Sequence, residues 1–276
     1  MQSNARLFAD DTALDRKIVT AEDAQTLQSD LDALAKWESE WDMTFHPDKC
    51  QVLHVDRSRT TRQTDYYLHG HKLKSVQSTK YLGVTLQTDG EFDLHISEVA
   101  NNGNKMLGFI RRSLKINSKS TKELAYKMLV RPKMEYASTV WDPHTDKQKD
   151  ELEKVQRRAA RVVTNRHRYT SSVTDMLDDL KWETLEQRRK DARLILMYKV
   201  LKGDVSIVCQ ELKLSISRPR RGIAAHSKNL DRCTCGTSYR LNAFLPRTVR
   251  DWNALPEEVV TAACAKDFRQ KLSELV

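Results

Sequence analysis

Two adjacent carboxylates, Asp10 and Asp11, follow a short apolar stretch near the start of the sequence. Residues 6–9 resemble a strand and residues 12–14 its return strand, which predicts a tight hairpin with both carboxylates at its tip. Hard cations such as Mg²⁺ require oxygen ligands, and a hairpin tip can hold two carboxylates rigidly. Aspartate also favours turns for backbone reasons alone. The residues therefore predict either a metal-binding tip or a plain turn.

A lysine in a later turn is a second candidate for chemistry. Thr20 and Asp23 are spaced to cap a helix that is expected to end near residue 43. The turn at residues 45–50 contains Lys49, which is either a proton donor or a surface lysine. The apolar stripe of the helix is expected to face a core and consists of Leu27, Leu31, Leu34 and Trp41.

A basic helix is predicted over residues 147–165, because apolar residues recur on one face of that stretch. A row of cations on its opposite face can follow a phosphate backbone, although a solvated outer face has the same pattern. A second basic cluster is expected at residues 218–221 with Lys228. The cations of the helix are Lys154, Arg157, Arg158 and Arg161.

Charge is unevenly distributed along the 276 residues. Residues 1–56 carry 5 Lys+Arg against 12 Asp+Glu, a net charge of −7, and the rest carries 42 against 26, a net charge of +16. A basic segment attracts polyanions, and nucleic acid is the usual one. No apolar run in the sequence is long enough to cross a membrane, and the N-terminal residues form no apolar signal core. The sequence therefore predicts no membrane partner. We expect an intracellular protein, in the nucleus or the cytoplasm, that is not secreted.

The cysteines do not predict a zinc site. Cys233 and Cys235 are separated by one residue and lie near His226. Structural zinc sites usually combine a C-x₂₋₄-C pair with a second pair of ligands at a defined spacing. No second pair follows here, so no zinc is expected.

The patterns predict an α+β chain in three parts. Residues 1–90 mix helix with short strands, including a strand over residues 51–56, a hairpin around Gly70 and a strand over residues 81–86. Residues 91–210 read as helices, one of them stopped by Pro132. Residues 211–276 contain a polar loop over residues 215–243 and then a short helical unit of uncertain order.

The order of several motifs resembles the reverse transcriptase of LINE-type (non-LTR), jockey-like retrotransposons. Residues 7–12 resemble motif C of that family, residues 45–50 motif D, and residues 80–84 motif E. Four further stretches resemble the thumb and C-terminal regions of these elements, namely residues 129–137, 140–141, 156–161 and 244–256. The resemblance implies a partial polymerase palm of β-hairpins and a helix, followed by a mainly α-helical thumb and a C-terminal extension.

The resemblance also implies roles for single residues. Asp10 would be the principal Mg²⁺ ligand and Asp11 its companion, while Lys49 would protonate the leaving pyrophosphate. The implied partners are an RNA template and a DNA primer. The implied primer grip consists of Tyr81, Leu82 and Gly83.

The family's other essential metal ligand, the motif A aspartate, lies before motif C and outside these 276 residues. We therefore expect an RNA-directed DNA polymerase fragment that is inactive alone. Mg²⁺ is expected only if a complete site is assembled, with the missing upstream part supplied in cis by a longer transcript or in trans. The alternatives are a non-catalytic nucleic-acid-binding module and the product of a pseudogene.

Overall fold

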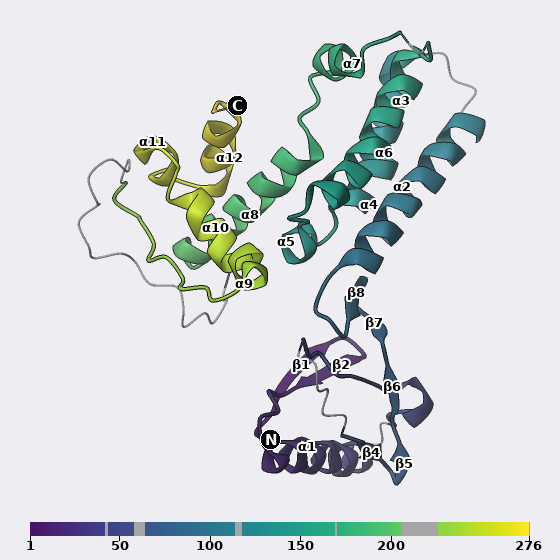
Figure 1. Cartoon of the computed structure of the whole chain (residues 1–276), viewed down its shortest axis with the longest axis vertical. Helices are drawn as coiled ribbons and strands as arrows, with labels where there is room; N and C mark the ends of the chain where they lie inside the picture. Colours follow the sequence, from purple (N-terminus) through teal and green to yellow (C-terminus); the bar gives the residue numbers. More distant parts are fainter. Residues whose placement is uncertain (42–43, 58–63, 114–117, 169, 206–225, 276) are drawn as a thin grey trace. The chain divides into compact units, whose positions relative to one another are not determined.

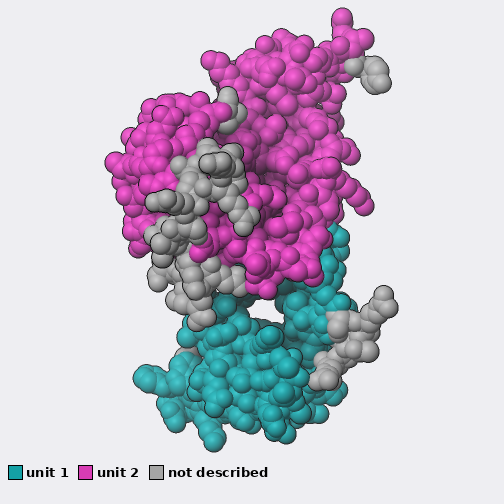
Figure 2. Space-filling model, turned by 60° about the vertical axis from the view of Figure 1, so that its left-hand side comes forward, with its two compact units in different colours: residues 1–94 teal, residues 95–276 magenta. Residues whose placement is uncertain are grey.

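The computed structural model describes residues 1–41, 44–57, 64–113, 118–168, 170–205 and 226–275. The chain is a mixed α+β protein, mostly helical, with small two-stranded sheets (Figure 1). It divides into two compact units, Met1–Leu94 and His95–Val276, which Figure 2 distinguishes by colour. In the described part of the chain, no helix is both long and apolar enough to span a bilayer.

Unit 1 contains all the strands of the described residues, and they pair two by two. Three of the four pairs are antiparallel, and the fourth is a parallel pair between segments far apart in the sequence. The pairs are β1 (Asn4–Phe8) with β2 (Asp11–Asp15), β3 (Gln51–Leu53) with β6 (Lys74–Val76), β4 (Tyr67–Leu68) with β5 (His71–Lys72), and β7 (Ser78–Tyr81) with β8 (Val84–Gln87).

Helix α1 (Ala21–Glu40) begins with the predicted capping pair. The N–H of Asp23 donates to Thr20 Oγ1 at 3.3 Å, and the N–H of Thr20 donates back to Asp23 Oδ2 at 3.0 Å. Backbone donation from Thr20 and Val19 lowers the pKa of Asp23 to about 2. The helix thus begins where its sequence predicts.

The core of unit 1 lies between α1 and the strands that follow it. Leu27 and Leu31 pack there as predicted, against buried Tyr66, Leu68 and Leu73. The expectation for Trp41 is wrong, because this residue is the C-cap of α1 and its side chain is 66% exposed. The last turn of a helix can leave a core even when the apolar spacing continues through it.

Two predicted strands of unit 1 differ from the structure. The strand expected over residues 51–56 ends at Leu53, where β3 ends. The stretch 81–86 is a hairpin and not one strand, because Leu82 and Gly83 form a two-residue turn between β7 and β8. A two-residue turn keeps the alternation of polar and apolar residues nearly unbroken, so the pattern alone resembled one strand.

The described residues of unit 2 are helical apart from connecting turns and loops. Helix α2 starts at Asp93, so the division between the units falls in its first turn. The elements are α2 (Asp93–Ser113), α3 (Lys119–Ala125), η2 (a π-helical turn, Tyr126–Val130), α4 (Arg131–Glu135), α5 (Ser138–Trp141), α6 (Asp146–Thr164), α7 (Val173–Leu180), α8 (Leu185–Lys202), α9 (Ser238–Asn242), α10 (Phe244–Trp252), α11 (Glu257–Val260) and α12 (Ala265–Ser273).

Contrary to the prediction, the consecutive helical segments continue through Pro132. It lies in the first turn of α4, where a proline costs no hydrogen bond because those N–H groups have no intrahelical acceptor. The turn η2 makes this possible, since the N–H of Arg131 donates back to the carbonyl of Tyr126, five residues earlier. The wider turn places the proline at a new helix start.

Helix α6 occupies the centre of the first helices of unit 2. Its predicted apolar residues, Leu152, Val155, Ala159 and Val163, are all at most 2% exposed. The neighbouring polar residue Gln156 is also buried, and it accepts a hydrogen bond from Tyr126 Oη at 2.9 Å. Its Nε2 donates to the carbonyl of Glu183 at 2.8 Å, so Gln156 joins α6 to η2 and to the turn before α8.

The last helices pack on α8 around a second apolar cluster. Trp252 and Phe268 lie at its centre with Leu194 and Met197 of α8. The predicted loop over residues 215–243 contains helix α9 in its described part, and residues 218–221 lie outside the described residues. Lys228 donates to the carbonyl of Val260 at 2.8 Å. The three-part division of the chain stays a prediction.

Two glycines of α2 provide a direct test of this packing. A Cβ on Gly103 would lie 2.9 Å from Met134 Sδ and 3.2 Å from Val155 Cγ1, whereas one on Gly108 would meet only the end of Arg112. We expect Gly103→Ala to lower the free energy of unfolding by about 1–3 kcal/mol through overpacking. Gly108→Ala is the matched control, and it should stabilise α2 slightly. Urea unfolding measures both, and equal effects would contradict the packing.

Candidate active-site hairpin and nucleic-acid interface

The two candidate metal ligands lie at the tip of the β1–β2 hairpin. Phe8 pairs with Asp11, so Ala9 and Asp10 form the two-residue turn and Asp11 begins the return strand. Both carboxylates are exposed. Ala9 has a φ of 52°, a left-handed conformation that glycine or asparagine usually adopts in such turns. Ala9 therefore has a backbone conformation that is energetically unfavourable for alanine, and strained backbone conformations are concentrated at functional sites.

The two carboxylates at this tip are the type of ligand that Mg²⁺ binds in proteins. Mg²⁺ is usually held by one or two carboxylates, waters and the phosphates of a substrate. Within the described residues, no three His, Cys, Asp or Glu side chains are grouped so that they could hold a metal ion. Asp10 and Asp11 therefore fit a site that a substrate or another carboxylate completes.

Lys49 ends the short 3₁₀ helix η1 (Pro47–Lys49), which leads into β3. Its side chain is exposed, and across the described part of the chain no hydrogen bond joins it to Asp10 or Asp11. The structure thus positions Lys49 in the turn that its motif predicts, without bringing it to the carboxylates.

The candidate primer-grip residues form the tip of the β7–β8 hairpin. Leu82 has a φ of 45° and Gly83 a φ of 80°, the pair of left-handed residues that a type I′ turn requires. Gly83 is exposed, while Tyr81 and Leu82 are half-buried. The turn presents backbone without a side chain at Gly83, which permits close approach of another molecule.

The four candidate cations of α6 fall into two pairs. Lys154 Nζ and Arg157 Nη1 each lie 2.9 Å from an oxygen of Asp150, so these two charges are partly neutralised. Arg158 instead donates to Asn104 Oδ1 of α2 at 2.8 Å. Arg161 lies with Arg158 beside a hollow between α2 and α6. The row of charges predicted from the sequence therefore divides into a paired part and a part that faces α2.

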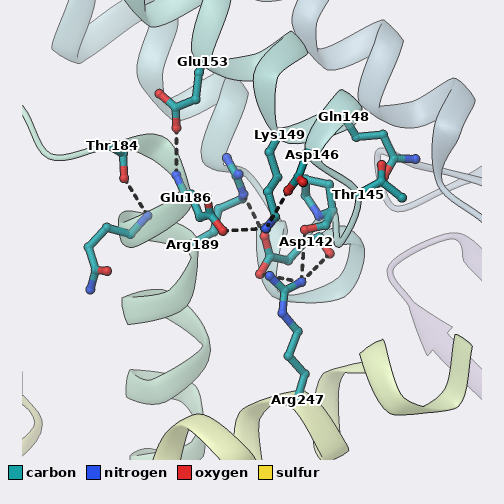
Figure 3. A network of polar contacts seen from close by, with 12 residues as sticks. Asp142, Thr145, Asp146, Gln148, Lys149, Glu153, Thr184, Glu186, Arg189 and Arg247 are labelled. Carbon is teal, nitrogen blue, oxygen red and sulfur yellow. Dashed lines mark hydrogen bonds and ion pairs between the residues drawn. The ribbon is translucent and has the colours of Figure 1, made fainter. Parts of the chain in front are cut away.

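The sequence patterns did not predict a buried ion network that links α5, α8 and α10. Arg189 Nε and Arg193 Nε of α8 lie 2.8 Å from the two carboxylate oxygens of Asp142. Arg247 of α10 lies 3.2 Å from the same carboxylate and donates to the carbonyls of Asp142 and Pro143 at 3.1 Å. Figure 3 shows Arg189 and Arg247 converging on Asp142.

Asp251 supplies the second carboxylate of this network, 3.0 Å from Arg193 Nη2. Three guanidinium groups thus share two carboxylates, and Nη2 of Arg189 has no hydrogen-bond partner among the described residues. Burial lowers the pKa of Arg247, and the Asp142 carboxylate opposes that change. The available sequence signal was the i, i+4 spacing of Arg189 and Arg193, which places both on one face of α8.

His226 lies in the same C-terminal part, and both of its ring nitrogens contact backbone groups. Nε2 lies 3.0 Å from the carbonyl of Trp252, and Nδ1 lies 3.2 Å from the N–H of Lys228. Cys233 and Cys235 are not joined by a disulfide, and Cys235 Sγ donates to the carbonyl of Cys233 at 3.5 Å. Of the side chains that suggested a zinc site in the sequence, His226 and Cys235 thus contact backbone groups, and the expectation of no zinc stays a prediction.

The fold and these sites describe a mixed α+β chain with a carboxylate hairpin and a basic helical unit. Over 95 residues, the chain is 32% identical to the RNA-directed DNA polymerase from mobile element jockey of Drosophila melanogaster. The match covers 33% of this chain and 10% of that polymerase. No family model matches the chain, and no solved structure matches it. The chain is therefore a distant and partial relative of a mobile-element polymerase.

Proposed function

We propose that this chain is the palm-and-thumb part of a reverse transcriptase of a non-LTR, jockey-like retrotransposon. Unit 1 then supplies the carboxylate hairpin and the primer-grip hairpin, and unit 2 supplies a thumb that binds the RNA template and the DNA primer. The observation that carries the proposal is the strained Ala9–Asp10 turn, which presents two adjacent exposed carboxylates in a relative of a polymerase.

Asp10 and Asp11 would hold Mg²⁺, which in polymerases neutralises the charge of the transferring phosphates. Lys49 would donate a proton to the leaving pyrophosphate. The Leu82–Gly83 turn would position the primer end through backbone contact, because Gly83 leaves room for it. The nucleic-acid contacts of the thumb would come from Arg158 and Arg161 of α6, because Asp150 already pairs with Lys154 and Arg157.

A second function is favoured by one observation. Asp10 and Asp11 are not grouped with a third metal ligand within the described residues, while residues 57–276 carry a net charge of +16. A non-catalytic nucleic-acid-binding module has these properties. The two functions differ in whether the carboxylate hairpin takes part when nucleic acid is bound.

Binding of Mn²⁺, a spectroscopic substitute for Mg²⁺, separates the two functions. The 276-residue chain is mixed with poly(rA)–oligo(dT) and dTTP, and bound Mn²⁺ is measured by water-proton relaxation. The polymerase proposal expects Asp10→Asn to weaken Mn²⁺ binding about tenfold, or about 1.4 kcal/mol. Asp32→Asn, at an exposed carboxylate of α1, is the matched control. Mn²⁺ binding that does not depend on Asp10, together with firm RNA binding, indicates the binding module.

Primer extension on the same template completes the test. We expect the chain to bind RNA and to add no nucleotides alone. Extension that Asp10→Ala abolishes would show that these 276 residues already contain the whole catalytic site. A chain that binds neither RNA nor primer–template contradicts both functions.

A further inference from the structure

A hollow of about 300 Å³ lies between α2 and α6 within unit 2. Its volume is at the lower end of the range of small-ligand sites, which is roughly 300–1,000 Å³. The two helices are close together on this side of unit 2, since Gly103 of α2 contacts Val155 of α6. The hollow is therefore bounded mainly by two packed helices, with His167 of the segment after α6 at its edge.

Three arginines line this hollow, Arg111 from α2 and Arg158 and Arg161 from α6. No Asp or Glu is among the lining residues. Across the described part of the chain, Arg111 and Arg161 have no ion-pair partner, and Arg158 has only the neutral amide of Asn104. Like charges near one hollow repel one another, and a bound anion would relieve that repulsion.

The rest of the lining consists of two apolar side chains, a glycine, the imidazole of His167 and the amide of Asn104, which already accepts from Arg158. Leu107 is buried and Val162 is half-buried. Gly108 has no side chain to cover its backbone, and His167 is exposed at the edge of the hollow. An apolar surface beside cations suits a ligand with a flat, poorly solvated part and an anionic part. Unpaired nucleotides have this combination, because the base is free to leave the stack while the phosphate keeps its charge.

We propose that this hollow binds one unpaired nucleotide of a single-stranded nucleic acid. Its phosphate lies against Arg111, Arg158 and Arg161, and its base lies on Leu107 and Val162. Lys154 and Arg157 of the same helix take no part, because Asp150 already pairs with them. This inference rests on the proposed nucleic-acid binding of unit 2 and specifies its ligand as a single strand.

Fluorescence anisotropy with labelled U₁₂, dT₁₂ and a 12-base-pair duplex tests the proposal on the whole chain. We expect the double variant Arg111→Gln/Arg161→Gln to weaken single-strand binding at least tenfold. The slope of log K against log salt should fall by at most about 0.7, because the arginines contact one phosphate and each neutralised phosphate of a single strand contributes about 0.7. The double variant Lys154→Gln/Arg157→Gln removes the same amount of charge, all of it from α6, and should bind nearly as the parent does.

Gly108→Leu fills the hollow without changing any charge. A Cβ there meets only the Arg112 guanidinium, and leucine favours helix more than glycine does, so the variant should fold at least as well. We expect about tenfold weaker binding of single strands with an unchanged salt slope. A thermal melt monitored by circular dichroism verifies the fold of each variant.

The outcomes separate this inference from the proposed function. If the parent binds single strands and both double variants weaken binding equally, or if the duplex binds as well as U₁₂, the hollow is not the site, while nucleic-acid binding stands. If the parent binds no nucleic acid, the proposed function fails and the inference fails with it. The affinity for U₁₂, compared with the affinity for dT₁₂, shows whether the bound strand is RNA or DNA.

Discussion

Replacing Asp142 with alanine is expected to lower the free energy of unfolding of unit 2 by about 3–5 kcal/mol. The carboxylate is 4% exposed and contacts Arg189, Arg193 and Arg247. Its removal leaves three buried guanidinium groups with Asp251 as their remaining carboxylate. An unpaired buried charge is costly because neither water nor a counter-charge stabilises it.

The measurement is urea unfolding monitored by circular dichroism at 222 nm, which reports on the helices that make up unit 2. Asp150→Ala is the matched control, since Asp150 also contacts two cations but at the exposed surface. Exposed ion pairs contribute little to stability, so the control should unfold nearly as the parent does. Equal losses in the two variants would mean that the Asp142 network is solvated in solution.

The second large effect is expected for Trp252→Ala, which should lower the free energy of unfolding by about 3–5 kcal/mol. Trp252 is 0% exposed, stacks on Phe268 at 5.8 Å between centroids, and donates from Nε1 to the carbonyl of Lys228 at 2.9 Å. The truncation removes a large apolar surface and leaves a cavity in the core of the last helices. It also leaves one buried carbonyl without its donor.

Trp252→Phe separates these contributions, because it keeps an apolar ring and removes the N–H. We expect it to cost about 1–3 kcal/mol, the range for a buried polar group that loses its partner. Trp41→Ala is the control at an exposed tryptophan and should change stability little. Hydrogen exchange of residues 226–275 localises the effect. Loss of RNA binding in Trp252→Ala with unchanged stability would instead identify Trp252 as a base-stacking residue.

The helices that the sequence predicted most accurately are those whose apolar spacing and end signals agree. Helix α6 was expected over residues 147–165 and spans Asp146–Thr164, and it ends at Asn165 in the left-handed conformation. The sequence also predicts a helix over residues 184–202 that ends at Gly203, and helix α8 begins after the cap Thr184 and ends at Gly203, which has a φ of 83°. Caps and periodicity are local properties, so a single sequence contains them.

Pairing between distant segments could not be predicted in the same way. The parallel pair β3–β6 joins residues more than twenty positions apart, and its strands have only three residues each. Arg189 and Arg193 also appear as ordinary surface cations until their partner is known. That partner, Asp142, lies 47 and 51 residues earlier in the chain. Their i, i+4 spacing places both arginines on one face of α8, but it does not identify the counter-ion.

The candidate catalytic residues show the same division. The sequence predicted that Asp10 and Asp11 lie at a hairpin tip, and the structure has them there. Local spacing could not show that Ala9 adopts a left-handed conformation at that tip, because glycine or asparagine is expected in such a position. The hollow beside Arg111 depends on how α2 packs on α6, which requires the tertiary structure.

The Asp142 network also has a consequence for the order in which the chain is made. Arg247 and the carbonyl of Asp142 are 105 residues apart, so translation places Asp142 and α8 outside the ribosome before their last partners exist. A nascent chain that ends before Asp251 has one carboxylate for its network arginines, and closure of so long a loop is slow. Folding of α8 can therefore be completed only after synthesis has passed α10.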